Sequence, residues 1–91
     1  MSVPNADSQP LPVRLRFRAS RGQYVRTKPL HPSQQVGAET SAGLEVGLHL
    51  IPTQELETLL LSFGDDVEVL APANLRERLA ARLQRAAAQY L

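Results

Sequence analysis

The sequence predicts an α+β fold in which strands and helices alternate along a single domain. Residues 13–18 and 44–51 alternate between apolar and polar side chains, as strands with one buried face do. Two later segments, which follow Pro52 and Pro72, repeat their apolar residues every three or four positions, as amphipathic helices do. With 91 residues, 43% of them hydrophobic, the chain is long enough for one modest core.

The strand predicted over residues 13–18 has a sharply divided pattern of side chains. Its inward positions are apolar and its outward positions are all arginine: Val13, Leu15 and Phe17 against Arg14, Arg16 and Arg18. A short helix is predicted over about 21–28, because Ser20 and Gln23 resemble a capping box and Pro29 bounds the far end.

A hairpin is predicted after this helix. Residues 34–39 are typical of a weak, polar edge strand, and Ser41-Ala42-Gly43 is a turn into the strand over 44–51. The inward residues of that strand are Leu44, Val46, Leu48 and Leu50.

The second half of the chain repeats the order of helix and strand. Thr53 is the predicted N-cap of a helix that Gly64 ends. Its predicted buried residues are Leu56, Leu59, Leu60 and Phe63. Val67 and Val69 form the core side of a fourth strand, and Pro72 suits the first turn of a final helix. That helix carries one apolar stripe made of Leu75, Leu79, Leu83, Ala86 and Tyr90.

The resulting order is β-α-β-β-α-β followed by a C-terminal helix. This order predicts a ferredoxin-like sandwich with the sheet order 4-1-3-2 and its helices on one face. We expect residues 1–12, rich in Ser, Pro, Asn, Asp and Gln, to form a disordered leader or linker, and residues 13–91 to form the domain. One face of the sheet is then uncovered unless the last helix or a partner lies on it.

Composition excludes several classes of function. The chain has no cysteine, which excludes disulfides and thiol chemistry, and His31 and His49 are a poor basis for a zinc site. No apolar run approaches the eighteen residues that span a membrane, and the N-terminus lacks a signal pattern. We therefore expect a cytoplasmic domain without metal or cofactor.

The net charge of +1 conceals a segregation of charge along the sequence. A first basic block holds Arg14, Arg16, Arg18, Arg21, Arg26 and Lys28. A second basic block lies in the last segment and holds Arg76, Arg78, Arg82 and Arg85. Between them lies an acidic block with no base: Glu39, Glu45, Glu55, Glu57, Asp65, Asp66 and Glu68.

The outward row of Arg14, Arg16 and Arg18 has several interpretations. Guanidiniums spaced about 7 Å apart on an open sheet could follow a phosphate backbone. They could instead pair with Glu45 and Glu68 on the flanking strands, in pairs that contribute roughly 0.2–1 kcal/mol each. An acidic patch of a neighbouring domain or a second subunit is a third possible partner. The outward positions carry no aromatic residue, which disfavours base stacking of the RRM kind.

The segment Arg18-Ala19-Ser20-Arg21-Gly22 leads from a strand into a helix N-terminus, where an anion could bind. Acylphosphatases, ferredoxin-like enzymes of similar length, hold phosphate at this place. Their glycine-rich cradle is missing here, and neither Asn5 nor Asn74 lies on the third strand. The histidines and serines also lack an arrangement suited to acid–base or nucleophilic catalysis, so we expect no enzyme.

The final helix has two interpretations. Its stripe could close the domain's own core, or it could dock on a partner subunit. At about eighteen residues it is longer than a four-stranded sheet needs. We expect its first half to be core and its second half, with Arg82, Leu83, Ala86 and Tyr90, to be an oligomer interface.

Two stretches of the chain resemble a known family. These are VRLRFRASRGQYVRTKPLHPSQ (13–34) and LLSFGDDVEVLAPANLRERL (60–79). Both are similar to the C-terminal extension, or WCX, domain of WYL-domain helix-turn-helix transcriptional regulators, and the resemblance spans about residues 12 to 90. It implies a ferredoxin-like extension that takes part in homodimer assembly and in sensing, with single-stranded DNA among the ligands of some members. The chain contains no Trp, no WYL motif and no room for a helix-turn-helix.

These observations together predict a non-catalytic assembly and ligand-sensing domain of a bacterial-type WYL regulator, acting as a homodimer with WYL and helix-turn-helix domains outside this chain. The alternative is a module that binds single-stranded DNA, a nucleotide-like effector or another phosphate ligand directly. In either case the expected contacts to an anion or partner are Arg14, Arg16, Arg18, Arg21 and Arg26.

Overall fold

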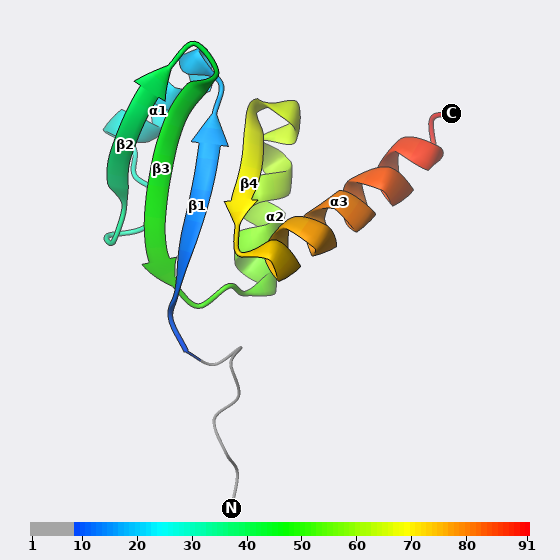
Figure 1. The fold of residues 1–91 in the computed structure, drawn as a ribbon. Coiled ribbons are helices and arrows are strands. Elements are labelled where there is room, and N and C mark those ends of the chain that lie inside the picture. Colours follow the sequence, from blue (N-terminus) through cyan, green and yellow to red (C-terminus); the bar gives the residue numbers. More distant parts are fainter. Residues whose placement is uncertain (1–8) are drawn as a thin grey trace, which may run out of the picture.

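The computed structural model describes residues 9–91, and its elements confirm the predicted α+β class. In chain order they are β1 (Leu11–Phe17), α1 (Ala19–Thr27), β2 (Gln35–Thr40), β3 (Gly43–Leu50), α2 (Gln54–Ser62), a 3-10 turn η2 (Gly64–Asp66), β4 (Val67–Ala71) and α3 (Ala73–Ala88). Figure 1 shows the four strands side by side, with α3 leaving the sheet at the β4 edge.

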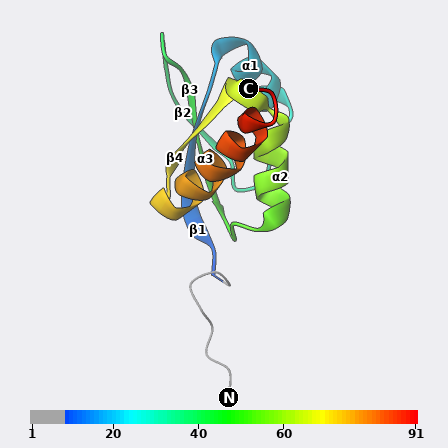
Figure 2. The same ribbon diagram turned by 90° about the vertical axis from the view of Figure 1, so that its right-hand side faces the viewer.

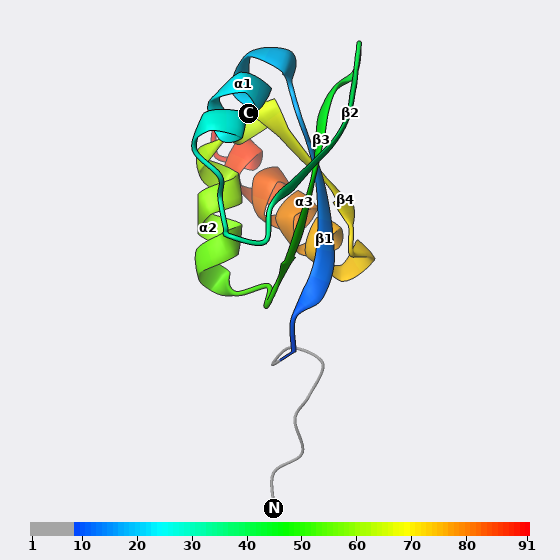
Figure 3. The same cartoon turned by 90° about the vertical axis from the view of Figure 1, so that its left-hand side faces the viewer.

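The four strands form one sheet in the order β2-β3-β1-β4, which is 4-1-3-2 when it is read from the β4 edge. Every neighbouring pair is antiparallel. Helices α1 and α2 lie on the same face, which Figure 3 shows in side view. Within residues 9–91 no helix or strand covers the opposite face, and α3 packs at one edge of the sheet (Figure 2).

The core is organised around the central strand β1. Val13, Leu15 and Phe17 are all fully buried, as the alternating pattern predicts. The rings of Phe17 and Phe63 meet edge to face, with centroids 5.2 Å apart and planes at 81°. Such pairs contribute about 0.5–1.5 kcal/mol beyond the area that they bury. Strand β1 therefore fixes the position of the helix that carries Phe63.

The ends of α2 follow the predicted signals. Thr53 caps the helix, since its Oγ1 accepts a hydrogen bond from the Leu56 N–H at 3.2 Å. Gly64 follows the C-cap residue Phe63 with φ of 61°, a left-handed conformation that glycine adopts without steric cost.

The predicted burial of Leu59 is wrong, because this side chain is 37% exposed. The buried stripe of α2 runs through Leu56, Leu60 and Phe63, and α3 packs on the side of the helix that carries Glu57. Leu59 lies on the other flank of that stripe, where no element covers it fully.

Two predicted boundaries are also wrong. Helix α1 begins at Ala19 and its N-cap is Arg18, with no side-chain cap, so Ser20 lies inside the first turn and forms no capping box. Strand β1 begins at Leu11, where it pairs with Leu50 of β3, so the last two residues of the predicted leader belong to the sheet. Residues 1–8 of that leader lie outside the described part of the chain.

The tight turn between β2 and β3 depends on Gly43. Its φ is 135°, and a Cβ there would lie 2.2 Å from the carbonyl oxygen of Phe17. We expect Gly43→Ala to lower the free energy of unfolding by about 2 kcal/mol or more, because strain and a clash with the central strand add. Urea unfolding followed by circular dichroism measures this change.

The matched control is Gly47→Ala on the same strand, where the nearest atom to an added Cβ is 3.9 Å away. Equal losses of stability in the two variants would show that the contact with Phe17 does not set the geometry of this turn.

Candidate functional site

The open sheet face carries arginines that are paired within the chain. Arg14 Nη2 donates to Glu45 Oε1 at 2.7 Å, and Arg16 Nη2 donates to Glu68 Oε1 at 2.6 Å. Arg18, at the end of the row, donates to the backbone oxygen of Asp65 at 3.0 Å and lies 3.8 Å from its carboxylate. Of the interpretations of this row, the geometry matches pairing with acids on the flanking segments.

The other two arginines predicted as contacts are paired as well. Arg21 lies 3.3 Å from the carboxylate of Asp66 and 5.6 Å from the ring centroid of Phe63. Arg26 Nη2 donates to Glu39 Oε1 at 2.6 Å. The five nominated arginines thus do not form one surface, because Arg21 and Arg26 belong to α1 and not to the open face.

Two glutamates are each shared by two arginines, and both hold α3 in place. Glu68 of β4 accepts from Arg16 of β1 and, at 2.7 Å, from Arg76 of α3. Glu57 of α2 accepts from Arg78 at 2.9 Å and from Arg82 at 3.4 Å. Arg82, predicted as an interface residue, is thereby tied to its own domain.

Sequence reasoning missed the role of Glu57, whose side chain is only 12% exposed. A signal was available, because Glu57 lies next to Leu56 on the flank of an apolar stripe, while the last helix carries four arginines and one acid. A carboxylate at such a position needs a cation from another element.

The ion pairs shift the titration of one carboxyl group. Hydrogen bonds from Arg76 first, and then from Arg16, lower the pKa of Glu68 below its ordinary value of 4.5. Burial opposes this shift but does not outweigh it. Glu68 therefore stays ionised between its two guanidiniums over the neutral range of pH.

Helix α3 changes character along its length. Leu75 and Leu79 are buried in the domain's core, whereas Leu83 is 45% and Tyr90 is 88% exposed. The predicted core role of the first half is thus met. Leu83, Ala86 and Tyr90 remain on the exposed half, where their role as an interface stays a prediction.

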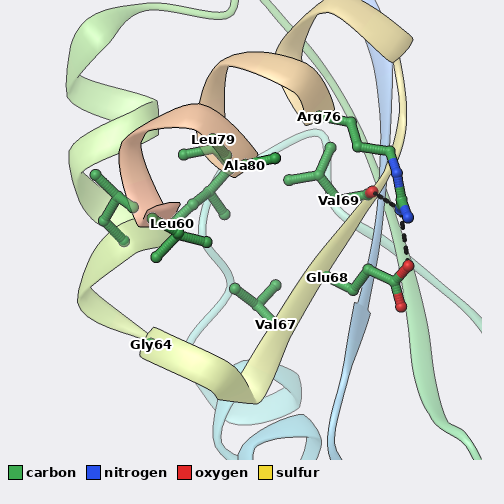
Figure 4. A pocket seen from close by; sticks show the side chains of 10 residues that line it. Leu60, Gly64, Val67, Glu68, Val69, Arg76, Leu79 and Ala80 are labelled. Atoms are coloured by element: carbon green, nitrogen blue, oxygen red, sulfur yellow. Dashed lines mark hydrogen bonds and ion pairs between the residues drawn. The ribbon is translucent and has the colours of Figure 1, made fainter. Parts of the chain in front are cut away.

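A pocket of about 200 Å³ lies between α2, β4 and α3. Its lining is mostly apolar and includes Leu60, Val67, Leu79 and Ala80, as Figure 4 shows. Glu68 and Arg76 stand at one side of it, joined to each other. We call this the α3 pocket.

The two histidines are hydrogen-bonded parts of the fold. The Ser33 N–H donates to His31 Nδ1 at 3.1 Å, and the backbone N–H of His49 donates to Ser33 Oγ at 2.8 Å. Residues 9–91 contain no group of three or more His, Cys, Asp or Glu side chains placed to hold a metal ion. Over the same residues, no helix has both the length and the apolar composition needed to cross a bilayer.

The fold and its site define a small α+β domain with internally paired charges and a projecting amphipathic helix. The family model of the WCX domain matches residues 9–87, so the chain belongs to the WCX domain family. This membership confirms the resemblance found in the sequence and associates the chain with WYL-type regulators. No curated protein matches the sequence.

The pairs of Glu57 predict a measurable loss of stability. We expect Glu57→Gln to lower the free energy of unfolding by about 1 kcal/mol or more, because it weakens two charge-assisted hydrogen bonds that attach α3 to α2. Glu55→Gln is the matched control, since Glu55 also lies in the first turn of α2 but is exposed. Urea unfolding measures both changes. Equal losses of the free energy of unfolding in the two variants would show that the negative charge at the start of the helix, and not the pairing with α3, is the cause.

The lowered pKa of Glu68 predicts a pH dependence. A carboxyl with a lower pKa in the folded state than in the unfolded state stabilises the fold above the unfolded pKa. That contribution is lost as the pH falls below 4.5 and through the lower folded value. We therefore expect the stability difference between the native chain and Glu68→Gln to shrink as the solution is acidified through this range. A difference that stays constant in unfolding curves would contradict the role of these pairs.

Proposed function

We propose that this chain is a non-catalytic assembly and ligand-sensing domain of a WYL-type transcriptional regulator. It acts in the cytoplasm with a WYL domain and a helix-turn-helix domain, and it assembles as a homodimer. Membership of the WCX family supports the regulator context. The sheet order and the antiparallel pairing of all neighbours also support a ferredoxin-like arrangement.

One observation carries the proposed assembly role: the apolar stripe of α3 continues beyond the domain's own core. Leu75 and Leu79 are buried, the same helical face then presents Leu83 and Ala86 to solvent, and the exposed Tyr90 follows in the turn after the helix. Figure 1 shows this end of α3 standing away from the sheet. A contiguous exposed apolar face supports docking on another surface, and a second copy provides a self-complementary one.

The ion pairs of α3 support one fixed orientation of the helix relative to α2 and β4, and so of its projecting half. Glu57 and Glu68 hold the helix from its first turn to its middle, through Arg76, Arg78 and Arg82. An event that moves α3 against α2 or β4 would therefore move the interface with it. The mechanism that we propose is a shift in the population of dimer geometries, which the helix-turn-helix domains then register.

Direct binding of single-stranded DNA or of a nucleotide-like effector is a second candidate. It is favoured by one feature: Arg16 and Arg76 share a single carboxylate, so this part of the open face keeps an excess of positive charge. It ranks second because a phosphate would have to compete with Glu45 and Glu68 for guanidiniums that these acids already hold.

The assembly role predicts that a charge on the exposed stripe weakens self-association. We expect Ala86→Glu to raise the dissociation constant of the dimer at least about tenfold, because the new carboxylate would be desolvated without a partner. Sedimentation equilibrium of the whole chain measures this constant.

The matched control is Ala88→Glu, the same substitution two positions further on and close to the opposite face of the helix. It should leave the dissociation constant within about twofold of the native value. A native chain that stays monomeric at every concentration, or equal effects of the two variants, would reject the proposed interface.

A further inference from the structure

The α3 pocket is a preformed concavity with an apolar wall and a charged side. Leucine, valine and alanine side chains from three elements form most of its wall, and Glu68 and Arg76 form one side. We propose that this pocket binds a small carboxylate with an aromatic body, which gives a ligand class to the sensing role proposed above and rests on it.

The size of the pocket sets the size of the ligand. Its volume of about 200 Å³ is smaller than the pockets that take drug-sized molecules. It exceeds the roughly 150 Å³ of an apolar protein cavity known to take up benzene. A single six-membered ring with a short acidic side chain therefore fits.

Small side chains keep this space open. Ala80 lines the pocket between the larger Leu79 and Leu83. Gly64 lines the opposite wall, and a Cβ built there would meet no atom within 4 Å. The fold itself thus leaves room between α3 and the turn that begins β4.

The charge at the side of the pocket favours an acidic ligand over a basic one. Arg76 Nη1 donates to Glu68 Oε2 and to the Val69 carbonyl oxygen, both at 2.7 Å. Glu68 also holds Arg16, so it keeps one guanidinium if Arg76 turns to a ligand carboxylate. Two cations around one anion leave a net positive charge at the β4 edge of the pocket, on the side of the open sheet face, from which Arg76 would turn to the ligand's carboxylate.

Occupancy of the pocket would act on the proposed interface. Leu83 lines the pocket and also belongs to the exposed stripe of α3. A ring bound against Leu79, Ala80 and Leu83 would contact both α3 and the α2–β4 wall. The ligand would therefore favour one angle between them.

The test uses phenylacetate as the probe and the whole chain as the protein, in a titration followed by amide chemical shifts in NMR. We expect saturable shifts centred on Gly64 and Ala80. The neutral 2-phenylethanol should bind more weakly, and 2-phenylethylammonium should bind weakest, because the three probes share the phenyl ring and carry an anionic, a neutral and a cationic group at the other end.

Two variants locate the site. Arg76→Gln should weaken the binding of phenylacetate about tenfold or more, as loss of a charge-assisted hydrogen bond does. Arg85→Gln removes the same charge from the exposed part of the same helix, outside the pocket, and should change the affinity by less than about twofold. Ala80→Leu fills the pocket without removing any polar contact and should abolish the shifts while the chain stays folded.

Several outcomes would overturn the proposal: no saturable shift with phenylacetate, equal binding of the cationic probe, or unchanged binding in Ala80→Leu. Shifts of the same amides on raising the protein concentration alone would assign the pocket to a second copy of the chain. Sedimentation of the same samples separates the test of ligand binding from the test of self-association. A dimer without probe binding rejects the ligand site alone, and probe binding by a chain that stays monomeric rejects the assembly role alone.

Discussion

The alternation of β1 is the constraint on which the rest of the structure depends. This strand is central, and its three apolar side chains are fully buried against both helices of the covered face. A shift of one residue would exchange Leu15 for Arg16 in the core, so burial fixes the register against β3 and β4. The same register sets Arg14 opposite Gly47 and next to Glu45, and Arg16 opposite Glu68, so the core pattern also decides which charges meet.

Folding removes the segregation of charge that the sequence displays. The first basic block meets the acidic block through strand pairing, and the second basic block meets it through the packing of α3. Segregated charges in a small α+β domain therefore need not mark a free basic surface. Antiparallel strands far apart in the sequence bring opposite blocks together, and each exposed pair then contributes about 1 kcal/mol or less. Their value lies in fixing geometry more than in adding stability.

Much of the fold followed from local patterns, because strand alternation, the Thr53 cap and the Gly64 stop are each recorded in a few neighbouring residues. The errors arose where tertiary packing decides. Leu59 and Glu57 lie on opposite flanks of one helical stripe, and only the position of α3 determines which flank is buried. The site was less predictable than the fold for the same reason. Pairing of the Arg row with Glu45 and Glu68 was one of the interpretations that strand order left open, whereas the α3 pocket depends on an angle between helices that no short sequence pattern encodes.

The direction of α3 is the last link between fold and function. A helix whose first two leucines, Leu75 and Leu79, are buried and whose third, Leu83, is 45% exposed could pivot about its buried end. Two carboxylates oppose this pivot from different elements, Glu57 on α2 and Glu68 on β4, and each is shared by two guanidiniums. The pairs of Glu68 are largely exposed and separate at a modest cost in free energy. The Glu57 carboxylate is only 12% exposed, so moving α3 away from α2 would leave a buried charge without its cation. The two carboxylates together therefore define one preferred direction of α3. A helix held in this way suits a domain that must pass a small change at its own surface to a partner.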